Sequence, residues 1–249
     1  MMREKTVFGP IFSRRLGSSL GINLLPQEGK VCNFDCIYCE CGWNKDGLAD
    51  RTIPSAKDVR EALEAKLLEC SGNGTPIDSI TFSGDGEPTL NPEFPQIVAD
   101  TLALRDRYFP SAKVSVLSNA TMAFKADVFE ALTRVDNPIM KIDAPTSEKA
   151  ALINRPVGRY SVEEVIASLE RFKGDFVLQT MFLKAPSFCT GDWVSEWMSI
   201  VRRLRPREVM VYTIDRETPM KGLSKYTVEE MRSLVQPLID EGYKIQIKG

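Results

Sequence analysis

The chain has 249 residues, with 32 Lys and Arg against 34 Asp and Glu, 43% apolar residues, six Cys and no His. A chain of this length buries about 75% of its unfolded surface, so one sizeable core forms without disulfide staples. The formal charge of −2 argues against a protein that chiefly coats nucleic acid or anionic membrane. The lack of His excludes Ser-His-Asp and Cys-His nucleophiles, His-ligated zinc hydrolases and an imidazole base.

The first residues, MMREKTVFGP, contain no apolar run of signal-peptide length, and nowhere do about 18 apolar residues follow one another. We therefore expect a cytoplasmic protein that makes no membrane contact. Thiols are normally reduced in the cytoplasm, so clustered Cys are expected to bind metal. No low-complexity tract, linker or charge block marks a second domain, and we expect a single domain over 1–249 and a monomer.

Short apolar, β-branched runs predict strands at 20–26, 77–83, 113–119, 138–143, 175–183 and 207–214. From the second run on, their starts are 25 to 37 residues apart, which is the length of a strand plus a crossover helix. A last alternating run, YKIQIK at 243–248, predicts one more short strand.

Amphipathic helices are predicted between these strands. Ser161 with Glu164, and Thr227 with Glu230, fit the capping box, in which each side chain bonds the other residue's backbone N–H. Ser55 and Asp58 do similar work ahead of a helix whose apolar face contains Val59, Leu63, Leu67 and Cys70. Similar stripes lie at 162–169 and 194–201, and the last helix runs from about Thr227 to Gly242.

Six strands, each followed by a helix, predict an α/β protein with a parallel sheet, either open or curled into a partial barrel. No GxGxxG follows the first strand, which weakens a dinucleotide-binding interpretation. In either architecture the chemistry belongs at the carboxyl ends of the strands. Those ends carry a Cys-rich loop, residues 83–88, Ser118 and Asn119, Lys141 and Asp143, Lys184, and Asp215 with Arg216.

Four of the six Cys lie in the ten-residue segment CNFDCIYCEC. A zinc site usually pairs two Cys hooks that are well apart in sequence, and a thioredoxin-like pair would not need the extra Cys of this segment. The third interpretation is an iron–sulfur cluster on Cys32, Cys36 and Cys39. A four-iron cluster needs a ligand on each iron, so three Cys leave one iron open for a non-protein ligand.

The segment CNFDCIYC resembles the motif of radical S-adenosylmethionine (SAM) enzymes, with Cys-x3-Cys-x2-Cys spacing and an aromatic residue, Tyr38, before the last Cys. The resemblance implies a partial (β/α)6 barrel and a [4Fe-4S] cluster on Cys32, Cys36 and Cys39. It implies that the amino and carboxylate groups of SAM chelate the open iron, and that Tyr38 belongs to the cofactor site. It also implies that reductive cleavage of SAM gives a 5'-deoxyadenosyl radical that abstracts hydrogen from the substrate. The electron would come from a flavodoxin- or ferredoxin-type donor.

A second motif, TFSGDGEPTL at 81–90, follows the next strand. These residue types predict a strand that ends in a Gly-rich bend, where the backbone can approach a ligand closely. In the family a Gly-Gly-Glu-Pro stretch at this place binds the amino group of SAM, a role that passes to Gly86 and Glu87. This chain departs from that form at Asp85. The resemblance also implies SAM contacts from Ser118, Asn119, Asp143 and Gln179; Asp143 could instead cap the next segment, and Gln179 could be a satisfied polar residue inside the barrel.

Four further segments, FGPIFSRRLGSSLGINLLP, KIDAP, LINRP and VYTIDRETP, resemble the wyosine-synthase-like (tRNA imidazoguanosine synthase-related) branch of this superfamily. Its characterised members build a tricyclic base from a methylated guanosine of transfer RNA and pyruvate. Two departures are expected to matter: no Cys precedes Cys32 in these 249 residues, where those enzymes carry extra Cys for a second cluster, and we expect no attached flavodoxin-like domain. A transfer RNA base is thus one candidate substrate and a partner protein is another.

Three residues are candidates for the catalytic chemistry. Cys41 and Cys189 are expected on the catalytic face, where they would contact substrate, supply a hydrogen atom or hold an auxiliary metal, unless they are ordinary loop residues. Lys141 would pair with a carboxylate or form a Schiff base with a keto acid. Cys70 is expected to be a core thiol.

Arginines fall into two groups. Five are near strand ends or their loops and are candidates for phosphate or carboxylate recognition: Arg14, Arg15, Arg155, Arg159 and Arg216. Arg202, Arg203, Arg205 and Arg207 are expected on a solvated surface.

Two alternative functions compete with a radical SAM enzyme that acts on a transfer RNA base. One is an activase that generates a glycyl radical on a partner protein, and the other is a non-catalytic iron–sulfur or zinc module.

Overall fold

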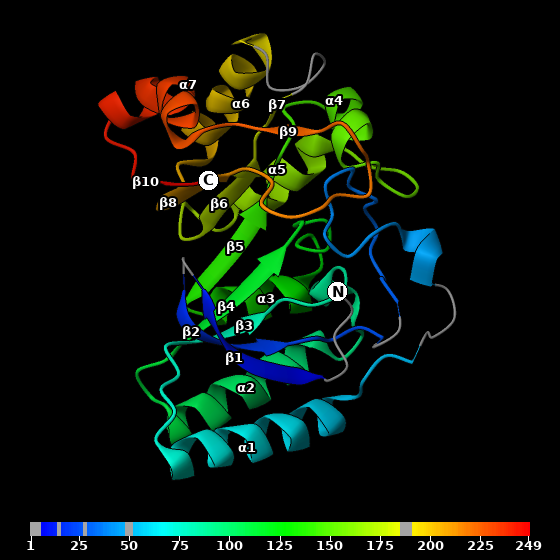
Figure 1. Ribbon diagram of the computed structural model, residues 1–249, viewed down its shortest axis with the longest axis vertical. Coiled ribbons are helices and arrows are strands. Elements are labelled where there is room, and N and C mark those ends of the chain that lie inside the picture. Colours follow the sequence, from blue (N-terminus) through cyan, green and yellow to red (C-terminus); the bar gives the residue numbers. More distant parts are fainter. Residues whose placement is uncertain (1–5, 14–15, 27–28, 48–51, 185–190) are drawn as a thin grey trace. The chain divides into compact units, whose positions relative to one another are not determined.

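The computed structural model describes residues 6–13, 16–26, 29–47, 52–184 and 191–249 (Figure 1). These residues form two compact units that interleave along the sequence. The first unit comprises residues 1–32, 44–118 and 122–138, and the second comprises residues 33–43, 119–121 and 139–249. A single domain over 1–249 stays a prediction.

The first unit contains a four-stranded sheet. Strand β1 (Val7–Ser13) is antiparallel to β2 (Gly17–Ile22), while β2, β3 (Ser79–Phe82) and β4 (Lys113–Ser118) run parallel. Helices α1 (Ala56–Asn73), α2 (Phe94–Tyr108) and α3 (Ala126–Arg134) follow β2, β3 and β4 in turn, and α1 and α2 lie side by side (Figure 1). Two short 3-10 turns, η1 (Asn44–Gly47) and η2 (Pro88–Leu90), complete the unit.

The second unit repeats the strand–helix order. Strand β5 (Asn137–Lys141), which starts at the end of the first unit, is parallel to β6 (Val177–Met181), and β6, β8 (Glu208–Tyr212) and β10 (Ile245–Lys248) are parallel as well. Helices α4 (Ser147–Ile153) and α5 (Val162–Glu170) follow β5, α6 (Gly191–Leu204) follows β6, and α7 (Val228–Asp240) follows β8. A small antiparallel pair joins β7 (Leu183–Lys184) to β9 (Ser224–Lys225). The predicted parallel α/β organisation is confirmed.

The helix starts follow the predicted caps. Ser55 and Asp58 form the reciprocal capping box of α1, and Thr227 and Glu230 form that of α7. At α5 the Ser161 hydroxyl accepts from the backbone N–H of residue 164 (3.3 Å), while the carboxylate of that residue binds Arg159. The capping box predicted at α5 therefore forms only in part. The Ser161 bond is present, but the carboxylate of residue 164 binds Arg159 and does not bond the backbone N–H of Ser161.

The apolar face of α1 is buried as its spacing predicts. Val59, Leu63, Leu67 and Cys70 are each exposed by 1% or less, so Cys70 is a core thiol. None of the helices among the described residues has both the length and the apolar content of a membrane span.

The first predicted strand starts three residues earlier and ends four residues earlier than the run at 20–26 indicates. Strand β2 ends at Ile22 because the side-chain carbonyl of Asn23 accepts from the Leu25 N–H (3.2 Å), an Asx turn that leaves the sheet. The sequence does not predict strand β1, because its Gly9-Pro10 pair and a bulge between Phe8 and Ile11 interrupt the alternation. Helix α4 also escapes prediction, since its seven residues are too few for a periodic pattern.

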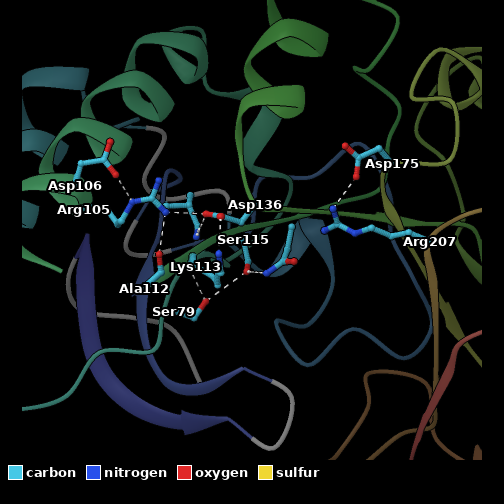
Figure 2. Close-up of polar contacts among 11 residues, drawn as sticks. Ser79, Arg105, Asp106, Ala112, Lys113, Ser115, Asp136, Asp175 and Arg207 are labelled. Carbon is cyan, nitrogen blue, oxygen red and sulfur yellow. Dashed lines mark hydrogen bonds and ion pairs between the residues drawn. The ribbon is translucent and has the colours of Figure 1, made fainter. Parts of the chain in front are cut away.

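Ion pairs tie the amino ends of the strands (Figure 2). In the first unit Asp136, just before β5, accepts from Arg105 Nη1 (2.7 Å) and from the backbone N–H of Val114 (2.9 Å). In the second unit Arg207, just before β8, donates to Asp175, just before β6, over 2.7 Å. These contacts are structural, and the carboxyl ends of the strands remain for chemistry.

Candidate functional site

In the first unit, the turn after β3 is bonded to the backbone just before the Cys-rich loop. The Val31 N–H donates to the Asp85 carbonyl (3.0 Å), and the Glu87 N–H donates to the Val31 carbonyl (3.0 Å). Gly86, in the middle of this bridge, has a φ of +142°, and a Cβ there would overlap the Val31 carbonyl oxygen. Only Gly allows this approach.

The carboxylate of Glu87 is buried and accepts hydrogen bonds from Ser118 and Thr89. Its Oε1 accepts from Ser118 Oγ (2.8 Å), Thr89 Oγ1 (2.5 Å) and Thr89 N (3.1 Å), and the residue is 3% exposed. These three donors orient the carboxylate. The first unit thus brings three predicted SAM contacts together, namely Gly86, Glu87 and Ser118.

The departure at Asp85 has a structural explanation. Asp85 is 1% exposed, its Oδ2 lies 3.4 Å from the Nδ2 of Asn23, and its backbone N–H donates to Asn23 Oδ1 (3.2 Å). Asn23 follows β2, so this pair links the ends of two neighbouring strands. Asp85 therefore orders the turn from inside the first unit.

In the second unit, the Cys-rich loop is pinned to residues 153–157, which follow α4. The Asp35 N–H donates to the Asn154 carbonyl (2.9 Å), and the Ile37 N–H donates to the Ile153 carbonyl (3.0 Å). Phe34 forms an antiparallel bridge with Pro156. The loop is therefore held by its backbone.

Cys36 is the buried thiol of this loop, with 5% exposure. Its Sγ accepts from Asn154 Nδ2 (3.4 Å), and its carbonyl accepts from the Cys39 N–H (3.1 Å), which closes a tight turn between the two Cys. Burial raises the pKa of the Cys36 thiol, and the positive charge of Lys141 opposes that rise only in part. Burial shields this thiol from reagents in solution, and the thiol must lose its proton to bind a metal.

A buried polar cluster lies next to Cys36, formed by Tyr38, Lys141, Asp143 and Asn154. The Tyr38 hydroxyl donates to Asp143 Oδ2 and accepts from Lys141 Nζ (2.8 Å). Asp143 Oδ2 also accepts from Asn154 Nδ2 (2.6 Å), and Asp143 Oδ1 accepts from the Met181 N–H (2.9 Å). Asp143 therefore joins the Cys-rich loop to β6.

Charge and burial perturb this cluster strongly. Burial raises the pKa of Tyr38 well above its usual value, and the neighbouring Asp143 carboxylate adds to the rise. Burial lowers the pKa of Lys141, but the charges of Cys36 and Asp143 outweigh it, so the net pKa is raised well above its usual value. Lys141 Nζ also lies 3.9 Å from Asp143 Oδ2, so its observed partner is a carboxylate.

The remaining predicted residues are placed as follows. Asn119 donates to Asn33 Oδ1 (2.7 Å) and so holds the start of the Cys-rich loop. Gln179 is 4% exposed and stands in register with Lys141 across β5 and β6, which puts both side chains on one face. Cys41 is half-buried in the loop, Cys32 closes the first unit, and Cys189 lies outside the described residues.

The arginines near the loop have partners. Arg155 stacks over the Trp43 ring at 5.1 Å, and Arg216 pairs with Glu40 over 2.8 Å. Arg159 pairs with the carboxylate of residue 164, and residues 14 and 15 lie outside the described residues. In the second group, Arg202, Arg203 and Arg207 form surface ion pairs as predicted for a solvated face.

The donor set fits an iron–sulfur cluster and SAM. Among the described residues no three Cys, Asp or Glu side chains are already gathered around one point. The fit lies instead in donor chemistry: closely spaced thiols without His, one of them buried and accepting an amide N–H. For SAM, the close approach at Gly86 and the buried carboxylate of Glu87 suit an ammonium group.

Two residues of this site escape prediction from the sequence. Asn23 and Asn154 are 0% and 2% exposed, and each bonds a carboxylate at a strand end. Asn directly after an apolar run is the one available signal for Asn23. Asn154 contacts residues 11 and 118 positions away, which no local pattern reveals.

Comparison with known proteins places this geometry in a family. A family model described as the radical SAM superfamily matches residues 29–179. A UPF0026 protein of Synechocystis sp. is 30% identical over 221 residues, which is 86% of this chain and 77% of that protein. A protein of Brachyspira hyodysenteriae named GTPase Obg is 28% identical over 92% of this chain, but the chain spans only 33% of its length.

Solved structures share the fold at low sequence identity. A radical SAM methyltransferase from Sphaerobacter thermophilus has a TM-score of 0.70 at 18% identity, over 95% of this chain and 67% of that one. Streptococcus suis SuiB bound to S-adenosylmethionine has a TM-score of 0.66 at 16% identity, over 89% of this chain and 49% of that one. TYW1 with a lysine-pyruvate adduct bound has a TM-score of 0.65 at 14% identity, over 92% of this chain and 76% of that one. These likenesses show a partial-barrel α/β fold.

Proposed function

The chain belongs to the radical SAM superfamily, and we propose that it cleaves SAM reductively to start hydrogen abstraction from a substrate. Enzymes of this superfamily use a [4Fe-4S] cluster and SAM as cofactors, and the fold and the family model assign both to this chain. When bound together, they supply a 5'-deoxyadenosyl radical after one electron arrives from an external donor, with methionine as the other product.

The cluster ligands in this proposal are Cys32, Cys36 and Cys39. One observation carries the assignment: the buried Cys36 accepts an amide hydrogen bond in a loop whose thiols have the family spacing. Tyr38, between two of these thiols, is fixed by Asp143 and Lys141 and keeps the loop closed.

The first unit supplies three of the SAM contacts in this proposal. Glu87 accepts the ammonium group, with Ser118 holding its carboxylate in place, and Gly86 lets the backbone approach. Asn119, Asp143 and Gln179 contact other polar parts of SAM, and Lys141 pairs with a carboxylate.

The test is anaerobic reconstitution with iron and sulfide, followed by reduction with SAM and chromatography for 5'-deoxyadenosine. Cys36→Ala should lose bound iron and product. Cys70→Ala, which removes a buried thiol from the core face of α1, should keep both. Equal product from Cys36→Ala and Cys70→Ala would contradict the proposal.

For the substrate we propose a transfer RNA base, as in the wyosine-synthase-like branch. The supporting observations are the four resembling segments, the fold likeness to TYW1 and an exposed Arg155 stacked on Trp43 beside the Cys-rich loop, since Arg and aromatic rings stack on unpaired bases. Cys41 and Cys189 are candidate hydrogen donors or auxiliary ligands in that reaction. The test is a measurement of transfer RNA binding at increasing salt concentration, and we expect the affinity to fall steeply.

The alternatives give different results in the same assays. An activase would place a radical on a glycine of a partner protein and would bind transfer RNA no better than other polyanions. A non-catalytic carrier would hold its cluster with four protein ligands, so SAM would leave the electron paramagnetic resonance spectrum of the reduced cluster unchanged.

A further inference from the structure

Asn154 belongs to the buried polar cluster and also contacts Cys36, the candidate ligand of the iron–sulfur cluster. Its side chain is 2% exposed, and its Nδ2 has three acceptors within reach: Asp143 Oδ2 at 2.6 Å, Tyr38 Oη at 3.4 Å and Cys36 Sγ at 3.4 Å. An amide nitrogen carries two hydrogens, so these acceptors compete.

The distances decide how the two hydrogens are used. The contact with Asp143 is short and takes one of them. A separation of 3.4 Å is long for an oxygen acceptor, whose N–H···O contacts span about 2.7–3.2 Å, but it is normal for the larger sulfur. The second hydrogen therefore points to Cys36.

The backbone of Asn154 fixes this geometry. Its N–H donates to the Ala150 carbonyl (2.7 Å) at the end of α4, and its carbonyl accepts from Asp35 N (2.9 Å) in the Cys-rich loop. The next residue, Arg155, has a φ of +46° and stacks on Trp43 of the same loop. One residue thus holds the loop by its backbone and the Cys36 sulfur by its side chain.

We infer that Asn154 is a positioning residue that donates an N–H···S bond to the Cys36 ligand and thereby raises the reduction potential of the cluster. The inference rests on the proposed function. Hydrogen bonds to cluster sulfurs stabilise the reduced, more negative state, because they disperse charge on the thiolate. Removing this donor makes the cluster harder to reduce and slows SAM cleavage at a fixed donor potential.

The test is a redox titration of the reconstituted protein, followed by electron paramagnetic resonance of the reduced cluster. Asn154→Leu keeps the number and branching of the side-chain heavy atoms and adds no charge, but it cannot donate. Asn137→Leu is the matched control, because Asn137 Nδ2 at the start of β5 donates to a hydroxyl oxygen, Ser115 Oγ (3.1 Å). We expect a midpoint potential shifted to more negative values in Asn154→Leu and unchanged in Asn137→Leu, at equal iron content.

Two further results keep the inference testable. If Asn154→Leu does not fold, Asn154→Ser restores a small donor near Asp143 but is too short to reach Cys36, so the same negative shift is expected. A fully loaded Asn154 variant with the wild-type potential would overturn the role of Asn154 while the proposed function stands. A wild-type protein that assembles no cluster would instead overturn the proposed function.

Discussion

The close approach at Gly86 gives a sharp test of the site in the first unit. Replacing Gly86 with Ala puts a methyl group into the Val31 carbonyl oxygen, at a φ of +142° that side chains rarely adopt. A backbone carbonyl cannot swing away like a side chain, so residues 85–87 must move. That movement breaks the two hydrogen bonds that join Val31 to Asp85 and Glu87.

The magnitude follows from these two effects. Backbone strain in this region costs about 1–3 kcal/mol, and two lost hydrogen bonds cost about 1 kcal/mol each. We therefore expect Gly86→Ala to lose roughly 3–5 kcal/mol of unfolding free energy. Gly74→Ala is the matched control: Gly74 has a φ of +73° at the end of α1, and nothing lies within 4 Å of the position that the methyl group would take, so only strain of about 1 kcal/mol applies.

The assay is urea unfolding of the wild type and both variants, followed by circular dichroism under anaerobic conditions at equal iron content. A difference of about 2–4 kcal/mol between the variants corresponds to a midpoint difference of about 1–2 M urea at an m-value of about 2 kcal/mol/M. Gly86→Ala should also bind SAM more weakly, whereas Gly74→Ala should not. Equal midpoints for the two variants would refute the close approach of Gly86 to Val31.

Three further predictions concern affinity, pH and packing. Glu87→Gln should keep its neutral hydrogen bonds but weaken SAM binding by about tenfold or more in anaerobic calorimetry, because the charge that pairs with the ammonium is lost; unchanged affinity would remove Glu87 from the site. Burial raises the pKa of Asp136, but the Val114 N–H and Arg105 outweigh it, so the pKa is lowered; its stabilisation is complete above the usual Asp range and is lost as pH falls through the lowered value. Asp136→Asn should accordingly flatten the acid side of the stability curve, and an unaltered curve would contradict the ion pair. Leu63→Ala, at 0% exposure on α1, should cost about 2–5 kcal/mol in urea unfolding, while Leu68→Ala, at 52% exposure on the same helix, should cost little; similar losses would argue against the packing of α1.

Local patterns in the sequence predict the elements that depend on neighbouring residues. The capping boxes of α1 and α7 lie within four residues, and the apolar stripe of α1 repeats at helical spacing, so both are visible in the sequence. Strand β1 is not, because its pairing with β2 is antiparallel and its own sequence is broken by Gly9-Pro10 and a bulge. The limit there is physical: pairing partners stabilise that strand more than its composition does.

The candidate site shows the same division. The Cys spacing and the Gly-rich turn are local and can be predicted, as can the position of Lys141 at the end of β5. The contacts of Asp85 with Asn23 join residues 62 positions apart, and those of Asn154 with Cys36 join residues 118 positions apart. Such pairs depend on the parallel sheet being formed, so one sequence cannot reveal them.

Side-chain amides make several of the contacts that fix the candidate site, in a chain that contains no His. Asn23, Asn33, Asn119 and Asn154 each use a side-chain amide to fix a segment that follows a strand or belongs to the Cys-rich loop. An amide donates and accepts without titrating, whereas an imidazole in the same place would change its hydrogen bonds between about pH 5 and 8. The loop geometry is therefore independent of protonation at its Asn positions, and the N–H that reaches Cys36 is present at every physiological pH.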